Sequence, residues 1–302
     1  MPEPTARDVG EFGLIAAVVA RLGSSPSVLL GPGDDAAVVA APDGRVVATT
    51  DVLVEGVHFR RDWSSAYDVG RKAAAANLAD IAAMGATGTA LLVGLAVPGH
   101  LELAWALELA DGLRDEVDLV GASVVGGDTV RSALLVIAVT ALGDLAGRAP
   151  VTRGGACPGD VVVLAGRLGW SAAGLRLLRS GETAGPFVEA HRRPHPPYAT
   201  GPLLAAAGAT AMCDVSDGLL ADLGHVARAS GVTVDLQSAL LHDEQVPLDD
   251  VLTGGEDHAL VATVPAGQPI PVGCRIIGRV LEGSPGVLVD GQPRTGGWDH
   301  FR

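Results

Sequence analysis

The residues of this chain that could do chemistry are aspartates, which recur next to apolar segments in several short motifs. Asp34 and Asp35 stand side by side in a Gly/Pro turn that leads into an apolar run. Two like charges this close repel each other, so such a pair is tolerated mainly in water or facing cations. One such motif is explained equally well as a solvated turn. Similar motifs follow at Thr49–Asp51, Asn77–Asp80, Gly126–Thr129 and Asp214–Gly218, and this repetition indicates one shared site.

The charge balance of the chain narrows what this site could bind. The formal net charge is −14, from 35 acidic and 21 basic residues. That excess argues against nucleic-acid binding, because phosphates need Lys and Arg for affinity, whereas carboxylates can hold hard cations. Lys72 is the only lysine and does not stand in a GxxxxGKS or GxxxxGKT sequence, which excludes a P-loop. If the protein handles phosphates, metal ions and arginines must supply the countercharge.

Length and composition predict a two-domain protein located in the cytoplasm. The chain has 302 residues, and its core must be filled by Ala, Val and Leu because aromatic residues make up only 3%. No apolar run is long enough for a membrane span, and the acidic, Pro-broken start does not resemble a signal peptide. Cys157, Cys213 and Cys274 are far apart and not in CxxC spacing, so neither a disulfide framework nor a zinc site is expected.

The start of the chain predicts a helix followed by short strands. Asp8 and Glu11 form a variant capping box for a helix that closes near Gly23. Strands are expected at residues 28–30, 38–39 and 46–47, with Thr50 and Asp51 at the end of the third. Because sites are commonly built where strands end, this position favours a functional role.

An Ala-rich segment from residue 67 to 84 predicts a helix that ends at Gly85. Asn77 and Asp80 are three residues apart, so they lie on one face of this helix. An aspartate among Ala, Leu and Ile is costly to bury without a partner. That cost favours a ligand role for Asp80.

Strands and a helix alternate in the segment that follows. Strands at residues 90–97, 119–125 and 134–142 around a helix at 101–117 are typical of an α/β or α+β fold. Gly127 and Asp128 come directly after the second of these strands. A Gly pair lets the backbone approach a ligand whose phosphate oxygens accept its N–H groups. The Gly/Pro-rich segment 143–159 then predicts an interdomain linker.

The second half contains further acidic motifs between predicted strands and helices. A Pro-rich loop with His191 and His195 is interpreted as a surface loop rather than a metal site. Ser216 or Asp217 could simply cap the helix that follows them, but Asp214 precedes the cap and so favours a ligand role. The segment Gly254–His258 again places a Gly pair before acids, ahead of a strand at residues 259–264.

The order of these motifs resembles the thiamine-monophosphate kinase family. The motifs are GDDAAV, TTD followed by EGVHF, NLADIAAMGA, GGDT, VTRGGACPGD, DVSDGL, LTGGED and a terminal WDHF, and they span nearly the whole chain. That family belongs to the PurM-like ATP-binding superfamily, which also contains selenophosphate synthetase and a hydrogenase maturation factor. The resemblance implies an α/β (α+β) fold of two domains. Residues 1–146 would form an ATP- and magnesium-binding domain whose mixed sheet pairs across a dimer axis, and residues 147–302 a C-terminal α/β domain.

The resemblance also implies an activity and a set of site residues. The activity is ATP-dependent phosphorylation of thiamine monophosphate to thiamine diphosphate, with several Mg²⁺ ions, by a homodimer. The implied magnesium ligands are Asp35, Thr49, Thr50, Asp51, Asp80, Asp128, Asp214 and Asp217. The implied ATP-binding residues are Gly127, Asp128, Arg153 and Ser216, and the implied substrate-binding residues are His58, Glu256 and Trp298. Those expected to act in catalysis are Asp35, Asp51, Asp128, Arg153 and Asp217.

Two alternatives to this interpretation belong to different classes. One is another PurM-like enzyme, but the first 150 residues contain no Cys for a selenophosphate synthetase, and the chain does not end in the reactive Cys of the maturation factor. The other is a non-catalytic divalent-ion-binding protein, which should not retain ATP. For the kinase we expect direct in-line transfer, because a phosphomonoester with a second pKa of about 6 is largely ionised at neutral pH and needs no general base.

Overall fold

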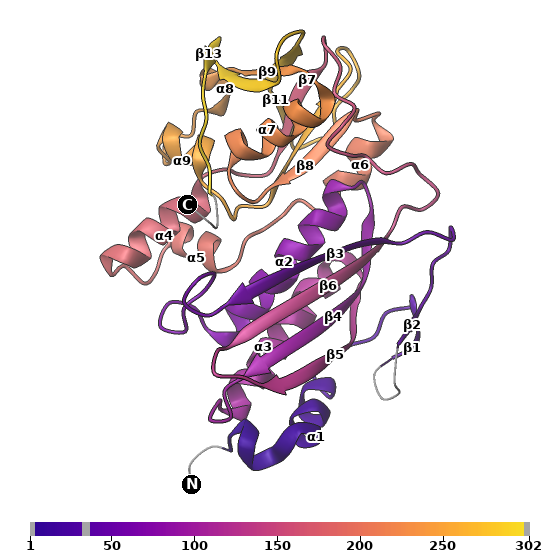
Figure 1. Ribbon diagram of the computed structural model, residues 1–302, viewed down its shortest axis with the longest axis vertical. Coiled ribbons are helices and arrows are strands. Elements are labelled where there is room, and N and C mark those ends of the chain that lie inside the picture. The colour runs from indigo at the N-terminus through magenta and orange to yellow at the C-terminus, as the bar shows by residue number, and fades with distance from the viewer. Residues whose placement is uncertain (1–3, 32–36, 299–302) are drawn as a thin grey trace. The chain divides into compact units, whose positions relative to one another are not determined.

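The computed structural model describes residues 4–31 and 37–298. The chain divides into two compact units, which are described separately below (Figure 1). Unit 1 comprises Met1–Ile81 and Thr87–Ala146, and unit 2 comprises Ala82–Ala86 and Gly147–Arg302. No helix among residues 4–31 and 37–298 has the length and apolar character needed to cross a membrane.

Unit 1 is built on a four-stranded sheet in the order β3-β6-β4-β5. Its strands are β3 (Val47–Val54), β4 (Thr87–Val97), β5 (Ser123–Arg131) and β6 (Val136–Asp144). β6 pairs antiparallel with both β3 and β4, whereas β4 and β5 are parallel. A parallel pair needs a crossover, which α3 (Leu103–Val117) and a short 3-10 turn supply. A small hairpin of β1 (Val28–Leu30) and β2 (Val38–Val39) and the helix α1 (Ala6–Val19) precede the sheet.

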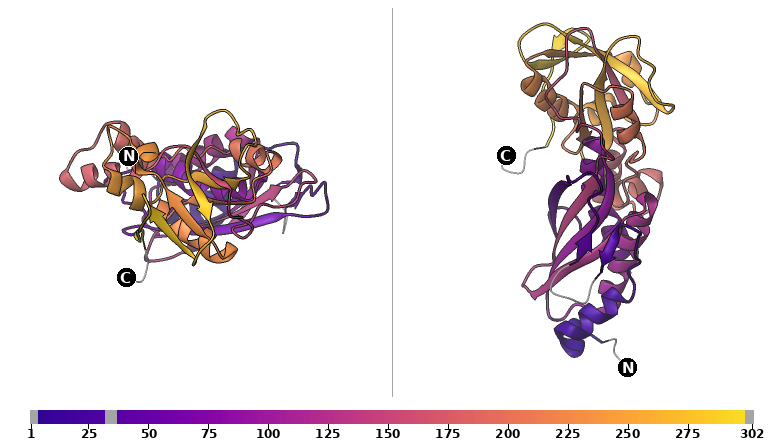
Figure 2. Two further views of the ribbon diagram at one scale, coloured as in Figure 1. Left: turned by 90° about the horizontal axis from the view of Figure 1, so that it is seen from above. Right: turned by 90° about the vertical axis from the view of Figure 1, so that its right-hand side faces the viewer.

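The two faces of this sheet differ in what covers them. On β6, the alternate residues Ile137, Val139 and Ala141 are fully buried on the face against which α2 (Ala66–Ala83) and α3 lie (Figures 1 and 2). The helices approach closely at Gly70, where a Cβ atom would lie 2.2 Å from the Leu109 carbonyl oxygen. Only glycine fits there, so the helix pair is held at a fixed separation.

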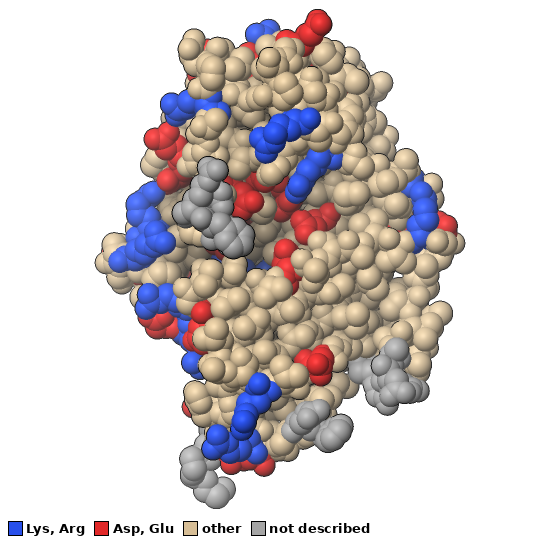
Figure 3. Space-filling model, viewed as in Figure 1, with Lys and Arg blue, Asp and Glu red and all other residues tan. Residues whose placement is uncertain are grey.

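The opposite face of the sheet carries exposed apolar side chains. Val52, Leu92 and Val130 come from β3, β4 and β5, and are 48%, 38% and 52% exposed. No helix among the described residues of unit 1 lies over them (Figures 1 and 2). The space-filling view has few charged residues over these strands (Figure 3).

Unit 2 contains a seven-stranded sheet in the order β13-β12-β9-β11-β7-β10-β8. Its strands are β7 (Val161–Ala165), β8 (Ala211–Val215), β9 (Thr233–Leu236), β10 (Ala259–Val264), β11 (Cys274–Leu281), β12 (Gly286–Val289) and β13 (Gln292–Pro293). All neighbours are antiparallel except β12 and β9. The helices are α4 (Trp170–Ser180), α5 (Pro186–Arg192), α6 (Thr200–Ala206), α7 (Leu219–Ser230), α8 (Ser238–Leu241) and α9 (Leu248–Thr253). The main core of the unit combines buried side chains of α7 with those of the central strands.

Several predicted elements have different boundaries in the structure. The capping box of α1 joins Thr5 to Asp8 rather than Asp8 to Glu11, with the Thr5 hydroxyl donating to the Asp8 carboxylate at 2.7 Å. Thr50 and Asp51 lie in the middle of β3, not at its end, because eight consecutive residues of β3 pair with β6. These partners lie about 90 residues further along the chain, where local sequence patterns carry no information about them.

The prediction that Gly127 and Asp128 follow a strand was also wrong, since both lie within β5. Eight residues of β5 pair in parallel with β4, and this ladder includes both of them. A Cβ atom on Gly127 would lie 1.9 Å from the Val93 carbonyl oxygen, and the register shifts nearby between Leu91 and Leu92. Glycine in a strand is expected where a bulge or a close backbone approach occurs.

Candidate active site

Strand β3 and helix α2 bring several of the predicted site residues together in unit 1. The Thr49 hydroxyl donates to a carboxylate oxygen of Asp80 at 2.7 Å, and the backbone N–H of Asp51 donates to Asn77 Oδ1 at 3.1 Å. Asn77 is fully buried and its amide also donates to the Ala73 carbonyl at 3.0 Å. The predicted helix face carrying Asn77 and Asp80 therefore lies against β3.

Thr50 and Asp128 lie on the other face of the sheet. The Thr50 hydroxyl donates to the Val139 carbonyl at 3.0 Å and accepts from Thr140 at 3.2 Å. The strand register places Asp128 in one row with Val52, whereas Asp51 shares a row with Gly127. Since alternate residues of a strand point to opposite faces, the sheet does not bring the Asp128 side chain to those of Asp51 and Asp80.

His58, in the loop after β3, is fixed by two neighbours. Its Nδ1 atom accepts a hydrogen bond from the Val54 backbone N–H at 3.1 Å. Nδ1 is thus an acceptor, so the ring proton of the neutral imidazole sits on Nε2, which can donate to a ligand. Lys72 is buried, and its ammonium donates to the His58 carbonyl at 3.3 Å. Both contacts orient the loop. Lys72, the only lysine of the chain, is buried where it makes its contact.

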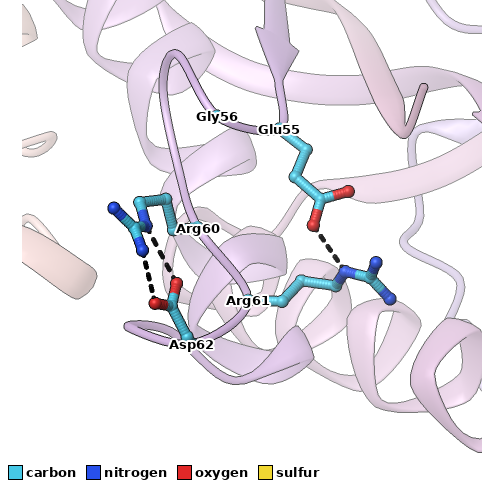
Figure 4. Close-up of a pocket in the computed structure, with 5 residues that line it drawn as sticks. All are labelled: Glu55, Gly56, Arg60, Arg61 and Asp62. Carbon is cyan, nitrogen blue, oxygen red and sulfur yellow. Dashed lines mark hydrogen bonds and ion pairs between the residues drawn. The ribbon is translucent and has the colours of Figure 1, made fainter.

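A shallow hollow next to this loop is lined by charges that are paired with each other (Figure 4). Arg60 donates to Asp62 at 2.6 and 2.9 Å, and Arg61 donates to Glu55 at 2.6 Å. The Arg60 guanidinium also lies over the Trp63 ring, 4.3 Å from its centroid. Two arginines and two acids compensate each other, so the hollow offers no excess charge to an anion. None of the predicted site residues lines it.

In unit 2, the loop after β8 is joined backbone to backbone with the loop before β10. The N–H of Glu256 donates to the Ser216 carbonyl at 2.8 Å, and a Cβ atom on Gly255 would lie 2.3 Å from that same oxygen. The N–H of Trp298 donates to the Asp217 carbonyl at 2.8 Å. Four predicted site residues, Ser216, Asp217, Glu256 and Trp298, are therefore neighbours in the fold.

In the loop before β10, the successive residues Glu256, Asp257 and His258 each contact a different element. Nδ1 of His191, in the last turn of α5, lies 3.5 Å from a carboxylate oxygen of Glu256. Asp257 accepts the backbone N–H groups of residues 169 and 171 at 2.6 and 2.9 Å, at the start of α4. Nδ1 of His258 lies 3.0 Å from a carboxylate oxygen of Asp214, at the end of β8. Glu256 and His258 both have positive φ, 63° and 52°, which is unusual for residues other than glycine.

Sequence reasoning missed His191, Asp257 and His258. The interpretation of residues 191–197 as a surface loop was wrong for His191, which is buried in α5 and hydrogen-bonded to the Ser171 hydroxyl at 2.9 Å. The prolines that suggested a loop begin only at Pro194, after the helix has ended. The Gly254–Gly255 pair could have pointed to the segment that carries His258, because adjacent glycines indicate that two backbone segments pack closely.

A buried carboxylate supports the loop that carries Ser216 and Asp217. Asp222, in the first turn of α7, accepts the N–H groups of Asp217 and Gly218, both at 3.1 Å. Burial, followed by the charge of Asp214, raises the pKa of Asp222 to about 7. The charge of Arg153 opposes this rise, so the Arg153 guanidinium lies within electrostatic range of the loop. Burial likewise raises the pKa of Asp257 to about 6, against the effect of the N–H groups of Ser171 and Gly169.

One of the predicted site residues lies outside the described part of the chain. Asp35 falls within residues 32–36 and so lies outside the described residues. Among the residues that are described, no group of three or more His, Cys, Asp or Glu is arranged to hold a metal ion by itself.

Comparison with known proteins assigns the family. Residues 33–145 match the family model of the AIR synthase related protein, N-terminal domain, and residues 157–269 match that of the C-terminal domain. A thiamine-monophosphate kinase of Mycobacterium tuberculosis is 50% identical to this chain over 315 residues, covering 99% of this chain and 93% of the relative. The chain belongs to the thiamine-monophosphate kinase family. The family that the ordered motifs predict is thus confirmed.

Solved structures confirm the predicted fold class. One member of the thiamine-monophosphate kinase family, described as AaThiL complexed with AMPPCP and TMP, is 34% identical, covers 98% of each chain and has a TM-score of 0.80. The hydrogenase maturation protein HypE is 17% identical, covers 94% of this chain and 97% of its own, and has a TM-score of 0.77. At that identity, the second likeness shows a shared fold alone. Both agree with a mixed helix and sheet fold of two domains.

Proposed function

We propose that this chain transfers the γ-phosphoryl group of ATP to thiamine monophosphate and so forms thiamine diphosphate, in the cytoplasm. The observation that carries this proposal is the full-length similarity to a solved family structure that holds an ATP analogue and TMP. We propose that residues 1–146 form the ATP-binding domain and that residues 147–302 form the C-terminal domain.

The donor atoms of unit 1 fit a magnesium ion chemically. Mg²⁺ takes oxygen ligands in octahedral geometry and keeps several waters, so it needs few protein ligands at one place. Thr49, Asp51 and Asp80 supply such oxygens from β3 and the facing side of α2. We assign several magnesium ions to the residues that the motifs indicate, and no single ion to all of them. The residues are Thr49, Asp51 and Asp80 at the helix-covered face of the sheet, Thr50 and Asp128 on its other face, and Asp35, Asp214 and Asp217. When bound, the ions would neutralise the charge of the phosphates.

The protein itself contributes orientation and charge rather than a nucleophile. His58 presents Nε2–H as a donor because its Nδ1 is occupied by the Val54 N–H, which suits holding an acceptor phosphate. Arg153 would stabilise the charge on the transferring group, together with Gly127 and Ser216 as ATP contacts. Glu256 and Trp298 would contact the acceptor. The ionised acceptor phosphate attacks directly, so no side chain needs to remove a proton.

We also propose that two chains associate through the uncovered face of the unit 1 sheet. Val52, Leu92 and Val130 expose apolar area on this face, and β3 and β5 are edge strands. Exposed apolar patches and open edges are commonly covered in oligomers with two-fold symmetry. A homodimer would bury this face.

The experiment that tests the reaction is a coupled assay of ADP release with a panel of phosphorylated acceptors. We expect turnover with thiamine monophosphate and none with unrelated phosphomonoesters. A non-catalytic ion-binding protein would release no ADP with any acceptor and would not retain ATP in equilibrium dialysis.

A further inference from the structure

The His258 side chain is held in place by an unusual backbone conformation at the start of β10. Its φ is 52°, in the left-handed region, and its N–H donates to the Val215 carbonyl at 3.0 Å. The next residues pair with β8 in register, Ala259 with Val215 and Leu260 with Asp214. A strained residue persists only where its surroundings hold it, and such residues cluster at functional sites. The effect of this conformation is to direct the imidazole to the end of β8.

There the imidazole meets the carboxylate of Asp214. Nδ1 lies 3.0 Å from Oδ2, and the side chains of His258 and Asp214 are only 8% and 4% exposed. An ionised carboxylate only accepts hydrogen bonds, so the proton of this contact belongs to Nδ1. Burying a carboxylate is costly unless it is hydrogen-bonded, and His258 supplies that donor.

Asp214 also stands among other acids. Its charge is one of the causes that raise the pKa of Asp222, and the charge of Asp217 acts on Asp222 in the same direction. Because negative charges on neighbouring acids repel, the hydrogen bond with His258 helps to keep the Asp214 carboxylate in one orientation. His258 contacts one of its two oxygens and leaves the other for a different partner.

We propose that His258 is a positioning residue that fixes the Asp214 carboxylate for a divalent cation. This inference rests on the proposed function, in which Asp214 is a magnesium ligand. Loss of a group that orients a ligating side chain typically lowers metal affinity or activity by about 10- to 100-fold. His258 itself touches neither the cation nor the substrates in this proposal.

The test compares two substitutions that both accept a positive φ. His258→Asn places an amide donor near the position of Nδ1, whereas His258→Gly removes the donor without straining the backbone. Mn²⁺ binding is titrated by electron paramagnetic resonance on the full chain with AMPPCP, which allows no turnover. We expect His258→Asn to bind Mn²⁺ within about threefold of the parent and His258→Gly to bind at least about tenfold more weakly. KM for thiamine monophosphate at saturating metal should stay unchanged in both.

A purely structural role would give a different pattern. His258→Gly would then unfold at a lower temperature but, while folded, bind Mn²⁺ as tightly as the parent, which would overturn the proposal. Equal losses in both variants would overturn it too, because the donor would not be the cause. If His258→Gly does not fold, nitrogen-15 spectra of the His-labelled parent answer the question. A protonated Nδ1 whose resonance shifts when Mg²⁺ is added to the parent with AMPPCP, but not when it is added to Asp214→Asn, supports the proposal. An unprotonated Nδ1, or a resonance that Mg²⁺ does not move, refutes it.

Failure of the proposed reaction would be recognised separately. The variants could show this Mn²⁺ pattern with AMPPCP while the parent transfers no phosphoryl group to thiamine monophosphate. That result would contradict the proposed reaction and not the role of His258.

Discussion

The hydroxyl of Thr49 donates a 2.7 Å hydrogen bond to the carboxylate of Asp80, and so joins the middle of β3 to the facing side of α2. The hydrogen bond holds one Asp80 oxygen and orients a half-buried acid on a helix whose neighbouring residues are almost all apolar. A helix could keep Leu or Ala there at no cost, so a carboxylate at this position indicates function.

The substitution Asp80→Asn tests whether the carboxylate of Asp80 is needed for activity. The amide oxygen can still accept from Thr49, so the fold should remain, but the charge that a cation requires is lost. We expect kcat/KM to fall by about 100-fold or more with an unchanged circular dichroism spectrum and unfolding midpoint. Asp249→Asn is the matched control, because the Asp249 side chain is 84% exposed and its contact with Arg294 contributes little. Normal turnover in Asp80→Asn would exclude this acid from the site.

The role of His58 can be separated from general loop stability by one substitution. In His58→Asn the amide oxygen can accept from the Val54 N–H in place of Nδ1, while the Nε2–H donor is lost. We expect KM for thiamine monophosphate to rise about tenfold with kcat changed by less than about threefold. Steady-state kinetics at saturating ATP measure both. A large fall in kcat with an unchanged KM would indicate a chemical role instead.

The raised pKa of Asp257 predicts that the stability of unit 2 depends on pH. Its pKa is raised from 3.8 to about 6 in the folded protein, so between these values the folded state binds more protons than the unfolded state. The contribution of Asp257 to the free energy of unfolding should therefore fall as pH rises through this window and level off above it, by about 2–3 kcal/mol in all. Asp222, whose pKa is raised to about 7, adds a fall that extends to higher pH. Asp257→Asn should lose only the contribution of Asp257, because its amide does not titrate.

The measurement is urea unfolding of parent and variant at pH values on both sides of the window. Asp290→Asn provides a contrast of opposite sign, since hydrogen bonds from Ser238 lower the pKa of Asp290. Parent and Asp257→Asn curves with the same pH slope would contradict the assignment to Asp257.

The sequence was most informative where local pattern and function coincide. The Ala-rich run and Gly85 predicted α2 within one residue at each end, and the spacing of Asn77 and Asp80 predicted their common face. Burial of that face depends on helix periodicity alone, which a single sequence carries. The ordered motifs predicted the family, although not which of their residues would meet.

Contacts between distant segments could not be predicted in this way. His258 meets Asp214 across 44 residues, and His191 meets Ser171 across 20, through pairings that depend on how β8, β10, α4 and α5 pack. Thr50 and Asp128 were expected beside Asp51, but strand alternation and register put their side chains on the other face. A one-residue offset in a strand reverses the face, and no local pattern fixed that offset here.

The proposed homodimer makes the exposed sheet face a target. Val52→Lys places a charge on this face, where two symmetry-related copies would bring like charges together. We expect the parent to be a dimer and Val52→Lys a monomer in light scattering at micromolar concentration. Val272→Lys is the control, because Val272 is fully exposed and belongs to unit 2 rather than to this sheet. A monomeric parent, or a dimeric Val52→Lys variant, would contradict the proposed interface.

The last prediction is that the γ-phosphoryl group passes directly from ATP to the acceptor phosphate, with inversion at phosphorus. A phosphoenzyme would need a nucleophile with an activating neighbour. Two described histidines do have an acid neighbour, His191 with Glu256 and His258 with Asp214, but both are buried, which argues against attack on ATP. Nδ1 of His58 accepts from a backbone N–H, and Cys213 is buried with its pKa raised well above normal. The acceptor phosphate is already ionised and needs no such help. With ATP chiral at the γ-phosphorus, a single displacement inverts the configuration, whereas retention would require two displacements and an enzyme-bound phosphoryl group.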